Sequence, residues 1–168
     1  MGATVDDRAF EFEAAVAREA NRLFSLALTI TGDTTQAEDA VQETMFSAWR
    51  SWGSLRDRSK VNAWLTRICV NHCIRQRRLA LRRLFWTSDE EMDRMRGANR
   101  ATSGNSDLVD FRRVFRRLSP PQRAVFALHV HHGYTLDECA ALIGCRPGTA
   151  RSHLGRAMAR LRKEMSDG

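Results

Sequence analysis

Apolar residues recur every three or four positions along most of the chain, a pattern typical of helices that bury one face. Three such runs fill the first half of the sequence: residues 9–30, 36–52 and 61–84. Gly32 ends the first run, and a capping box of Thr35 and Glu38 is expected to open the second. No run alternates apolar with polar residues, so the sequence predicts no strand and an all-α fold.

Residues 85–107 lose this periodicity and collect glycine, serine and acidic residues. Such a segment cannot bury enough apolar surface to order itself, so we interpret it as a flexible acidic linker between two small helical domains. The expected domains are residues 9–84 and residues 108–165. Within the second domain, Ser106 and Ser119 are expected to cap the first two helices, and Pro147 is expected to open the last.

A helix-turn-helix unit is expected at about residues 136–155. Thr135 and Glu138 form a second capping box, and Gly144 can take the positive φ that a tight turn between two helices requires. Ala140 is small enough for the two helices to cross closely, and Ala150 and Leu154 are expected to form the inward face of the second helix. The outward face near the start of the second helix is rich in groups that can meet base edges in the major groove. An ordinary helical hairpin with a solvated basic face is the alternative.

The net charge of +7 is unevenly distributed. Residues 50–84 hold ten basic side chains and one acidic one, and residues 112–168 hold eleven and four. The remaining two segments, residues 1–49 and 85–111, are acidic. Two basic blocks suggest two separate polyanion sites. Of the 27 basic residues only Lys60 and Lys163 are lysines, so nearly all are arginines. Arginine suits phosphate and guanine recognition, but an arginine-rich codon usage explains this ratio equally well.

Three stretches resemble the sigma-70 family of RNA polymerase sigma factors, and specifically its extracytoplasmic-function (ECF) subgroup. GYTLDECAALIGCRPGTARSHLGRAMARLR is similar to region four of that family, the helix-turn-helix region. GDTTQAEDAVQETMFSAWRSW resembles region 2.2, and VNAWLTRICVNHCIRQRR resembles regions 2.3 and 2.4. The resemblance covers roughly residues 10–84 and 108–165, in the order and spacing of the family.

The resemblance implies a factor that binds bacterial core RNA polymerase, directs it to specific promoters and initiates transcription. The region 2 domain, residues 9–84, would open and read the downstream (minus ten) promoter element as a single strand. The region 4 domain, residues 108–165, would read the upstream (minus thirty-five) element as duplex. The linker, residues 85–107, would thread toward the active-site and RNA-exit channel of the polymerase, although a solvated tether is an equal alternative for its carboxylates. A dedicated anti-sigma protein is the expected inhibitor.

The resemblance also implies roles for individual residues. The expected polymerase-binding strip is Asp39, Gln42 and Glu43, although a polar strip is also typical of any surface helix. The expected contacts with the downstream element are Arg56, Arg58, Lys60, Arg67, Asn71, His72, Arg75 and Arg78. The expected contacts with the upstream element are Arg146, Thr149, Arg151, Ser152, His153 and Arg156. Arg75 departs from the acid that many relatives carry there, so downstream specificity is expected to differ.

Other chemistry has little support in the sequence. Three tryptophans, Trp49, Trp52 and Trp64, lie on apolar stripes, so packing is a better interpretation than base stacking. Four cysteines, Cys69, Cys73, Cys139 and Cys145, fall where small apolar residues fit, which favours buried thiols over a zinc or redox site. The sequence shows no enzyme motif, no signal peptide and no membrane span, so we expect a cytoplasmic protein without cofactor, metal or small-molecule substrate.

Two other functions remain as alternatives. A free-standing helix-turn-helix regulator would bind duplex operators as a dimer, but the basic charge of residues 50–84 is unexplained for an effector domain. An RNA-binding or scaffold protein would explain the charge but not the residues at the expected turn around Gly144.

Overall fold

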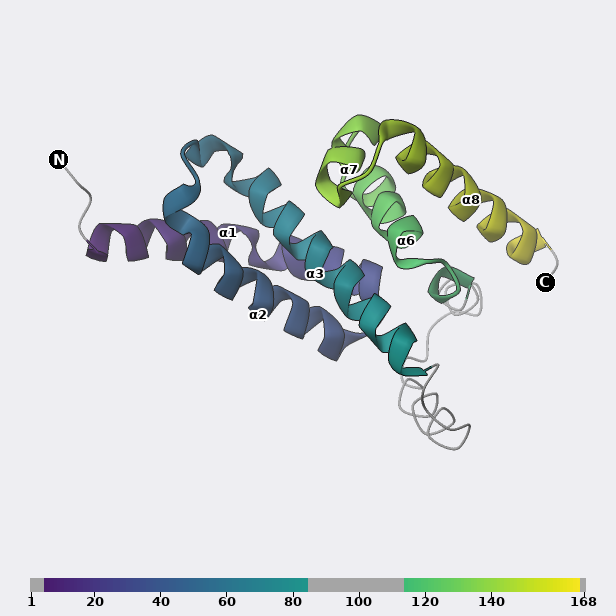
Figure 1. Cartoon of the computed structure of the whole chain (residues 1–168), viewed down its shortest axis with the longest axis horizontal. Helices are drawn as coiled ribbons and strands as arrows, with labels where there is room; N and C mark the ends of the chain where they lie inside the picture. The colour runs from purple at the N-terminus through teal and green to yellow at the C-terminus, as the bar shows by residue number, and fades with distance from the viewer. Residues whose placement is uncertain (1–4, 85–113, 167–168) are drawn as a thin grey trace.

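The described residues, 5–84 and 114–166 of a computed structural model, form helices joined by short turns (Figure 1). In these two ranges there is no strand, which confirms the predicted all-α class. The first range holds α1 (Val5–Thr31), α2 (Thr34–Ser51) and α3 (Val61–Leu84). The second holds α6 (Pro120–Phe126), α7 (Leu136–Ile143) and α8 (Pro147–Ser166). The expected linker, residues 85–107, lies outside the described residues, and with it the expected helix cap at Ser106.

The corner between α1 and α2 depends on Gly32 and Asp33. Gly32 has a φ of 72°, a left-handed conformation in which a side chain is strained. Asp33 caps α2 because its side chain accepts a hydrogen bond of 2.9 Å from the backbone N–H of Gln36. The predicted cap at Thr35 is therefore wrong. Thr35 lies inside the first turn of α2, and the carboxylate two residues earlier satisfies the free amide that a cap must reach.

The loop between α2 and α3 has regular structure of its own. It contains two short 3₁₀ turns, η1 (Trp52–Ser54) and η2 (Arg58–Lys60), and α3 then begins at the predicted residue, Val61. Trp52 is 1% exposed and lies edge-on to Phe12, with ring centres 5.2 Å apart. This aromatic contact fixes the loop against α1 and confirms Trp52 as a packing residue.

The second range begins with a helical turn at residues 114–116 and continues into α6, which Ser119 precedes. The backbone N–H of Ser119 donates to Oε1 of Gln122 at 2.9 Å, and Pro120 takes the first helical position, as expected. After α6 the chain widens into one π-helical segment, η3 (Ala127–His131), and Gly133 turns it with a φ of 71°. α7 and α8 follow as the predicted helix pair.

The buried apolar residues do not form two separate cores. A single cluster joins residues of both ranges, including Leu26 and Ile30 of α1, Leu65 of α3, Val125 of α6 and Leu128 of η3. A smaller cluster belongs to the second range alone: Val114, Phe115, Leu118, Phe126, Ala157 and Leu161. In Figure 1, α6 and α7 lie against the side of α3. We call the first three helices the α1–α3 module and the last three the α6–α8 module; the two pack together directly.

Candidate nucleic-acid interface

The expected polymerase-binding strip is an exposed face of α2. Asp39, Gln42 and Glu43 are all exposed, at a spacing that places them side by side on a helix. The opposite face is buried and consists of Ala37, Ala40, Thr44 and Ala48. The strip continues to Phe46, which is 59% exposed and has the guanidinium of Arg50 over its ring at 5.6 Å.

Sequence reasoning missed Phe46, although its position three residues after Glu43 on the polar stripe was a readable signal. An aromatic ring on an otherwise polar helix face is unusual unless a partner covers it. The α2 strip therefore combines two carboxylates with one large apolar side chain.

The three basic residues of the loop before α3 have different environments. Arg58 donates to the backbone oxygens of Trp52 and Leu55 at 2.9 and 3.0 Å, and its guanidinium lies 4.0 Å from the ring centre of Trp52. Arg58 therefore braces the loop itself. Arg56 and Lys60 are exposed, and Nζ of Lys60 lies 3.4 Å from Oδ2 of Asp57. Hydrogen bonds from Ser59 hold the pKa of the Asp57 carboxyl below its usual range, so this carboxylate stays charged within the basic loop.

The exposed side of α3 carries Arg67, Asn71 and Arg75, each four residues from the next. They form one row, as expected for a surface that follows a nucleic-acid backbone. His72 differs from the expectation of an exposed residue. It is half-buried, and its Nε2 lies 3.1 Å from Oγ of Ser47 in α2. Arg78 lies in α3 at a position whose side chain is outside the described part of the chain.

The helix-turn-helix unit has the predicted construction. The backbone N–H of Thr135 donates to Oε2 of Glu138 at 2.7 Å, and the backbone N–H of Glu138 donates to Oγ1 of Thr135 at 3.2 Å. Gly144 ends α7 with a φ of 73°. A Cβ at this residue would meet nothing within 4 Å, so the glycine is required for its backbone conformation and not for space. Ala140 and Ala150 are buried where the helices cross.

The start of α8 presents the expected upstream contacts. Five of them are exposed: Arg146, Thr149, Arg151, Ser152 and Arg156. The hydroxyl of Ser152 donates to the backbone oxygen of Gly148 at 2.9 Å, which leaves its oxygen to accept. His153 is the exception because it is half-buried, and its Nδ1 has no hydrogen-bond partner among the described residues. Burial, with the nearby Arg156, lowers the pKa of His153, so the ring is neutral at pH 7.

His153 faces a hollow of about 520 Å³ between the two modules. Asn71 and Arg75 of α3 line this hollow from one side, and His153 and the turn residue Cys145 line it from the other. The structure therefore places two of the expected downstream contacts and one expected upstream contact, His153, around one space. The sequence, with its two separate basic blocks, gave no indication of this.

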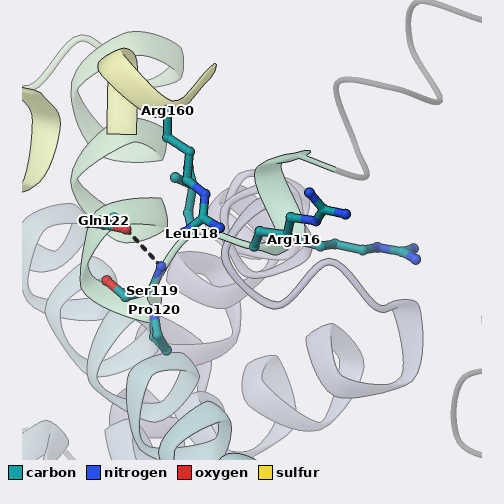
Figure 2. Close-up of a pocket in the computed structure, with 7 residues that line it drawn as sticks. Arg116, Leu118, Ser119, Pro120, Gln122 and Arg160 are labelled. Carbon is teal, nitrogen blue, oxygen red and sulfur yellow. Dashed lines mark hydrogen bonds between the residues drawn. The ribbon is translucent and has the colours of Figure 1, made fainter. Parts of the chain in front are cut away.

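A second hollow lies at the other end of the α6–α8 module. It is lined by residues 116–120, Gln122 and Arg160, and Figure 2 shows Arg116 and Arg160 at its rim. Arg117 and Arg160 both pair with Glu164, at 2.7 and 3.2 Å. These ion pairs neutralise part of the positive charge around the hollow. None of the expected upstream contacts lines this hollow, so the expected recognition face of α8 is a different surface.

The four cysteines are free thiols, and three of them, Cys69, Cys73 and Cys139, are buried. A hydrogen bond with Cys69 and burial raise the pKa of Cys73 above its usual range, and burial raises the pKa of Cys139 to about 11. Protonated, enclosed thiols are poor nucleophiles and poor metal ligands. Among the described residues, no group of three or more His, Cys, Asp or Glu side chains is placed to hold a metal ion. No helix in the described ranges is long and apolar enough to cross a membrane.

Two family descriptions match the chain in the same order as its modules. Residues 15–83 match "Sigma-70 region 2", and residues 108–161 match "Sigma-70, region 4". The chain is similar to the ECF RNA polymerase sigma factor SigM of Mycobacterium tuberculosis, with 30% identity over 161 residues that cover 96% of this chain and 80% of the relative. It is also 29% identical over 155 residues to the RNA polymerase sigma-E factor of Streptomyces coelicolor, covering 92% of this chain and 86% of that protein.

Solved structures share the arrangement of helices. The sigma factor RpoE from Bartonella quintana, crystallised with the anti-sigma factor NepR, matches with a TM-score of 0.63 and 26% identity. The match covers 92% of this chain and 96% of that one. CnrH, solved in complex with the cytosolic domain of CnrY, matches with a TM-score of 0.57 at 24% identity, which supports the fold alone.

Proposed function

This chain belongs to the sigma-70 family as an ECF-type sigma factor, and on that premise we propose how each of its surfaces is used. Members of the family are initiation factors rather than enzymes, so the function of the chain is to bind core RNA polymerase and direct it to promoters. The division of labour among residues 9–84, 85–107 and 108–165, and the place of the protein in the cytoplasm, are parts of the proposal.

The α2 strip is the proposed polymerase contact. Asp39, Gln42 and Glu43 face outward together, and the exposed ring of Phe46 extends the same surface. A partner surface with basic and apolar groups would complement this combination. The exposure of the strip opposite a buried face of three alanines and Thr44 is the single observation that carries this assignment.

The row on α3 is the proposed contact with the downstream element. Arg67, Asn71 and Arg75 supply positive charge and an amide along one line, and Arg56 and Lys60 add charge from the preceding loop. Because Arg58 is engaged by two backbone oxygens and by Trp52, we propose that it shapes the loop. His72, hydrogen-bonded to Ser47, has a similar supporting role, and Arg78 would extend the row.

The exposed start of α8 is the proposed contact with the upstream element. Arg151 and Arg156 can donate to guanine edges, while Arg146 and Thr149 lie where the helix enters the groove. An anti-sigma protein is the proposed regulator, in line with the complex that RpoE from Bartonella quintana forms with the anti-sigma factor NepR.

Transcription with a reconstituted polymerase tests the proposed function. Bacterial core enzyme would be incubated with fragmented genomic DNA, with and without the purified chain, and the 5′ ends of the transcripts would be sequenced. We expect a new set of start sites that share two spaced sequence elements. If the start sites are the same without the chain, and the chain alone binds duplex DNA tightly, it is an operator-binding regulator instead.

A further inference from the structure

The loop between α2 and α3, residues 52–60, begins at a contact with the first turns of α1. Phe12 of α1 packs against the rings of Trp49 and Trp52, with ring centres 5.2 Å apart in both pairs. Arg8 lies one turn earlier, and its Nη2 donates to the backbone oxygen of Trp49 at 3.4 Å. The guanidinium of Arg8 also lies 5.4 Å from the centre of the Trp49 ring. The end of α2, where the loop begins, is therefore fixed on α1.

Arg58 connects the middle of the loop to the same part of α1. Its Nη1 donates to the backbone oxygens of Trp52 and Leu55 at 2.9 and 3.0 Å, and its guanidinium lies 4.0 Å from the ring centre of Trp52. Its Nε lies 3.5 Å from Oε2 of Glu11 in α1. A planar guanidinium can stack on a ring and donate from its edge at the same time, whereas an ammonium group cannot. One side chain thus joins α1, the end of α2 and the loop.

Hydrogen bonds within the loop fix its backbone. The backbone N–H of Leu55 donates to the backbone oxygen of Trp52 at 3.2 Å, and that of Lys60 donates to the backbone oxygen of Asp57 at 3.2 Å. Oδ1 of Asp57 accepts from the backbone N–H and the hydroxyl of Ser59, at 3.0 and 2.6 Å. The loop therefore has a defined conformation and presents its exposed basic side chains from fixed positions.

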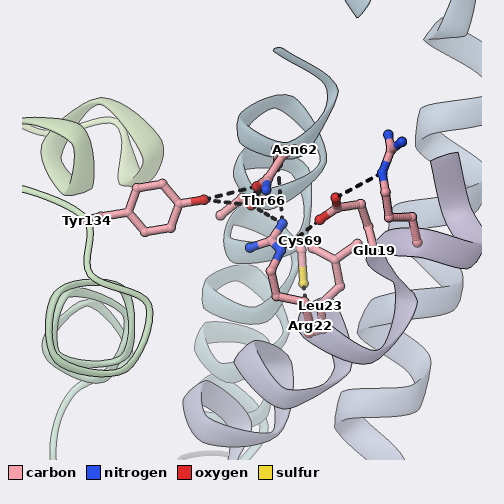
Figure 3. A network of polar contacts seen from close by, with 8 residues as sticks. Glu19, Arg22, Leu23, Asn62, Thr66, Cys69 and Tyr134 are labelled. Carbon is pink, nitrogen blue, oxygen red and sulfur yellow. Dashed lines mark hydrogen bonds and ion pairs between the residues drawn. The ribbon is translucent and has the colours of Figure 1, made fainter. Parts of the chain in front are cut away.

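A polar network fixes the far end of the loop, at the start of α3 (Figure 3). Arg22 of α1 donates to Oγ1 of Thr66 at 2.7 Å and to the backbone oxygen of Asn62, the second residue of α3, at 3.4 Å. Arg22 is itself held by Glu19, with Nε and Oε2 2.7 Å apart. Both ends of the loop are therefore anchored on α1.

We infer that Glu11, Phe12 and Arg58 are positioning residues for the downstream element. They hold the loop in the conformation that presents Arg56 and Lys60 to the single strand. The inference rests on the proposed function and extends it to α1, on which none of the expected DNA contacts lies. Groups that are held in their binding geometry by neighbouring residues lose less freedom when the ligand arrives.

A direct contact of Arg58 with the strand is the competing role. Such a contact would draw the guanidinium away from Trp52, which is 1% exposed with Arg58 in place. Departure would expose part of this ring to water and would leave the backbone oxygens of Trp52 and Leu55 with one donor fewer each. The existing contacts therefore favour a positioning role for Arg58.

Conservative substitutions test the inference in the full-length chain. Arg58→Lys keeps the positive charge but loses the forked donor and the planar contact with Trp52. Glu11→Gln removes the ion pair on α1 and keeps the size of the side chain. The matched controls are Arg56→Lys in the same loop and Glu13→Gln on the exposed side of α1. Unfolding in urea, followed by circular dichroism, checks that each variant is folded.

Hydrogen exchange followed by mass spectrometry measures the loop in the free chain. We expect the amides of residues 53–60 to exchange about tenfold faster in Arg58→Lys, because the two short turns open more often once the side chain no longer holds them. Glu11→Gln should show a smaller increase, and both controls should exchange as the wild type does. Exchange rates in Arg58→Lys and Glu11→Gln equal to those of the controls would overturn the inference.

Binding of single-stranded DNA by the polymerase holoenzyme measures the effect on recognition. The probe is a fluorescent oligonucleotide with the non-template strand of the downstream element, taken from a promoter recovered in the transcription experiment. Arg58→Lys should bind it about tenfold more weakly and Glu11→Gln about threefold more weakly. Affinity for core polymerase, and for a duplex with the upstream element alone, should not change. Faster loop exchange together with normal affinity for the oligonucleotide would show a purely structural role and would overturn the inference.

The salt dependence of this binding separates positioning from direct contact. Arg56→Ala, at a proposed contact, should lower the slope of log affinity against log salt concentration by about 0.7, as expected for one lost phosphate contact on a single strand. Arg58→Ala should weaken binding with a smaller change in slope. An equal fall in slope in both variants would mean that Arg58 contacts the strand, and would reject its positioning role.

The proposed function and the inference can fail separately. Failure of the wild-type chain to redirect core polymerase would refute the proposed function. Normal redirection by the wild type, together with unaltered oligonucleotide binding by Arg58→Lys, would refute the inference alone.

Discussion

Nη1 of Arg123 and the backbone oxygen of Ile30 lie 3.0 Å apart, although 93 positions separate the two residues in the sequence. The contact places a fully buried cation at the carboxyl end of a helix in the other module. Four backbone oxygens surround this one side chain, from Ile30, Thr31, Arg116 and Leu118. Arg123 thus links the folding of the α6–α8 module to its docking on α1.

Replacement of Arg123 by methionine should strongly destabilise the protein. The substitution keeps most of the side-chain volume but deprives buried backbone oxygens of their donors, at about 1–3 kcal/mol for each buried group left unpaired. We expect the free energy of unfolding to fall by about 3 kcal/mol or more, as measured by urea denaturation. Arg18→Met, on the exposed side of α1, should change it by less than about 0.5 kcal/mol. Equal stabilities of the two variants would show that the hydrogen bonds of Arg123 contribute nothing.

The α2 strip gives a prediction about polymerase binding. Replacement of Asp39 and Glu43 by lysine reverses two exposed charges and buries none, so the fold should be retained. Affinity for core polymerase should fall at least about tenfold. The new lysines would face the basic groups that we propose for the polymerase surface, and like charges repel. Analytical gel filtration or fluorescence anisotropy measures the affinity. Glu13→Lys, an exposed charge reversal on α1, is the control, and an affinity equal to that of this control would remove α2 from the interface.

Arg151 and Arg156 give a prediction about the upstream element. If each donates to a guanine, alanine at either position should weaken promoter complexes by about 1–3 kcal/mol and relax the preference at one base pair. Arg162→Ala, further along α8, should weaken binding without changing sequence preference. Transcription from a library of promoters with randomised upstream elements separates these effects. Wild-type preferences in both Arg151→Ala and Arg156→Ala would exclude direct reading by these residues.

His132 makes the folded protein sensitive to acid. Burial, then Arg22 of α1 and His131, lower the pKa of His132 from its ordinary value of 6.5, and its Nε2 has no hydrogen-bond partner within the described ranges. The unfolded chain therefore binds the proton more readily than the folded one. The stabilisation is complete above pH 6.5 and is lost as the pH falls from 6.5 through the lowered value.

Urea denaturation at pH 7.5 and at pH 5.5 measures this effect. The wild-type protein should lose more stability between the two pH values than His132→Gln, whose side chain does not titrate. His153 shifts in the same direction, so the variant should keep part of the acid sensitivity. Identical pH dependence of the two proteins would mean that His132 is not a source of it.

Local sequence signals predicted the local structure well. The capping box of Thr135 and Glu138, the positive φ of Gly144 and the start of α8 at Pro147 all depend on residues within a few positions of each other. The wrong prediction at the start of α2 also concerns residues that are close in the sequence. Both Asp33 and Thr35 are good cap residues, and only the backbone geometry shows that the Asp33 carboxylate reaches the amide of Gln36.

Long-range contacts could not be predicted in this way. An arginine near the start of a helix is normally exposed, so nothing in the sequence marks Arg123 as buried. The apolar residues Val125 and Leu128 indicated that α6 and η3 have a buried face. They did not indicate that α1 and α3 of the other module help to cover this face. For the same reason, sequence reasoning placed Arg58 and His72 among the nucleic-acid contacts and did not foresee their bonds to Trp52 and Ser47.

The hydrogen bonds of Arg116 and Arg123 to the end of α1 are directed at main-chain oxygens, which every amino acid supplies alike. The side chains of residues 30 and 31 are buried for other reasons, but these hydrogen bonds make no demand on their identity, provided that the helix ends in the same place. Comparisons that search for correlated substitutions between pairs of positions would be blind to this contact. Substitutions can therefore change the strength of this contact chiefly at Arg116 and Arg123, the two residues that donate the hydrogen bonds.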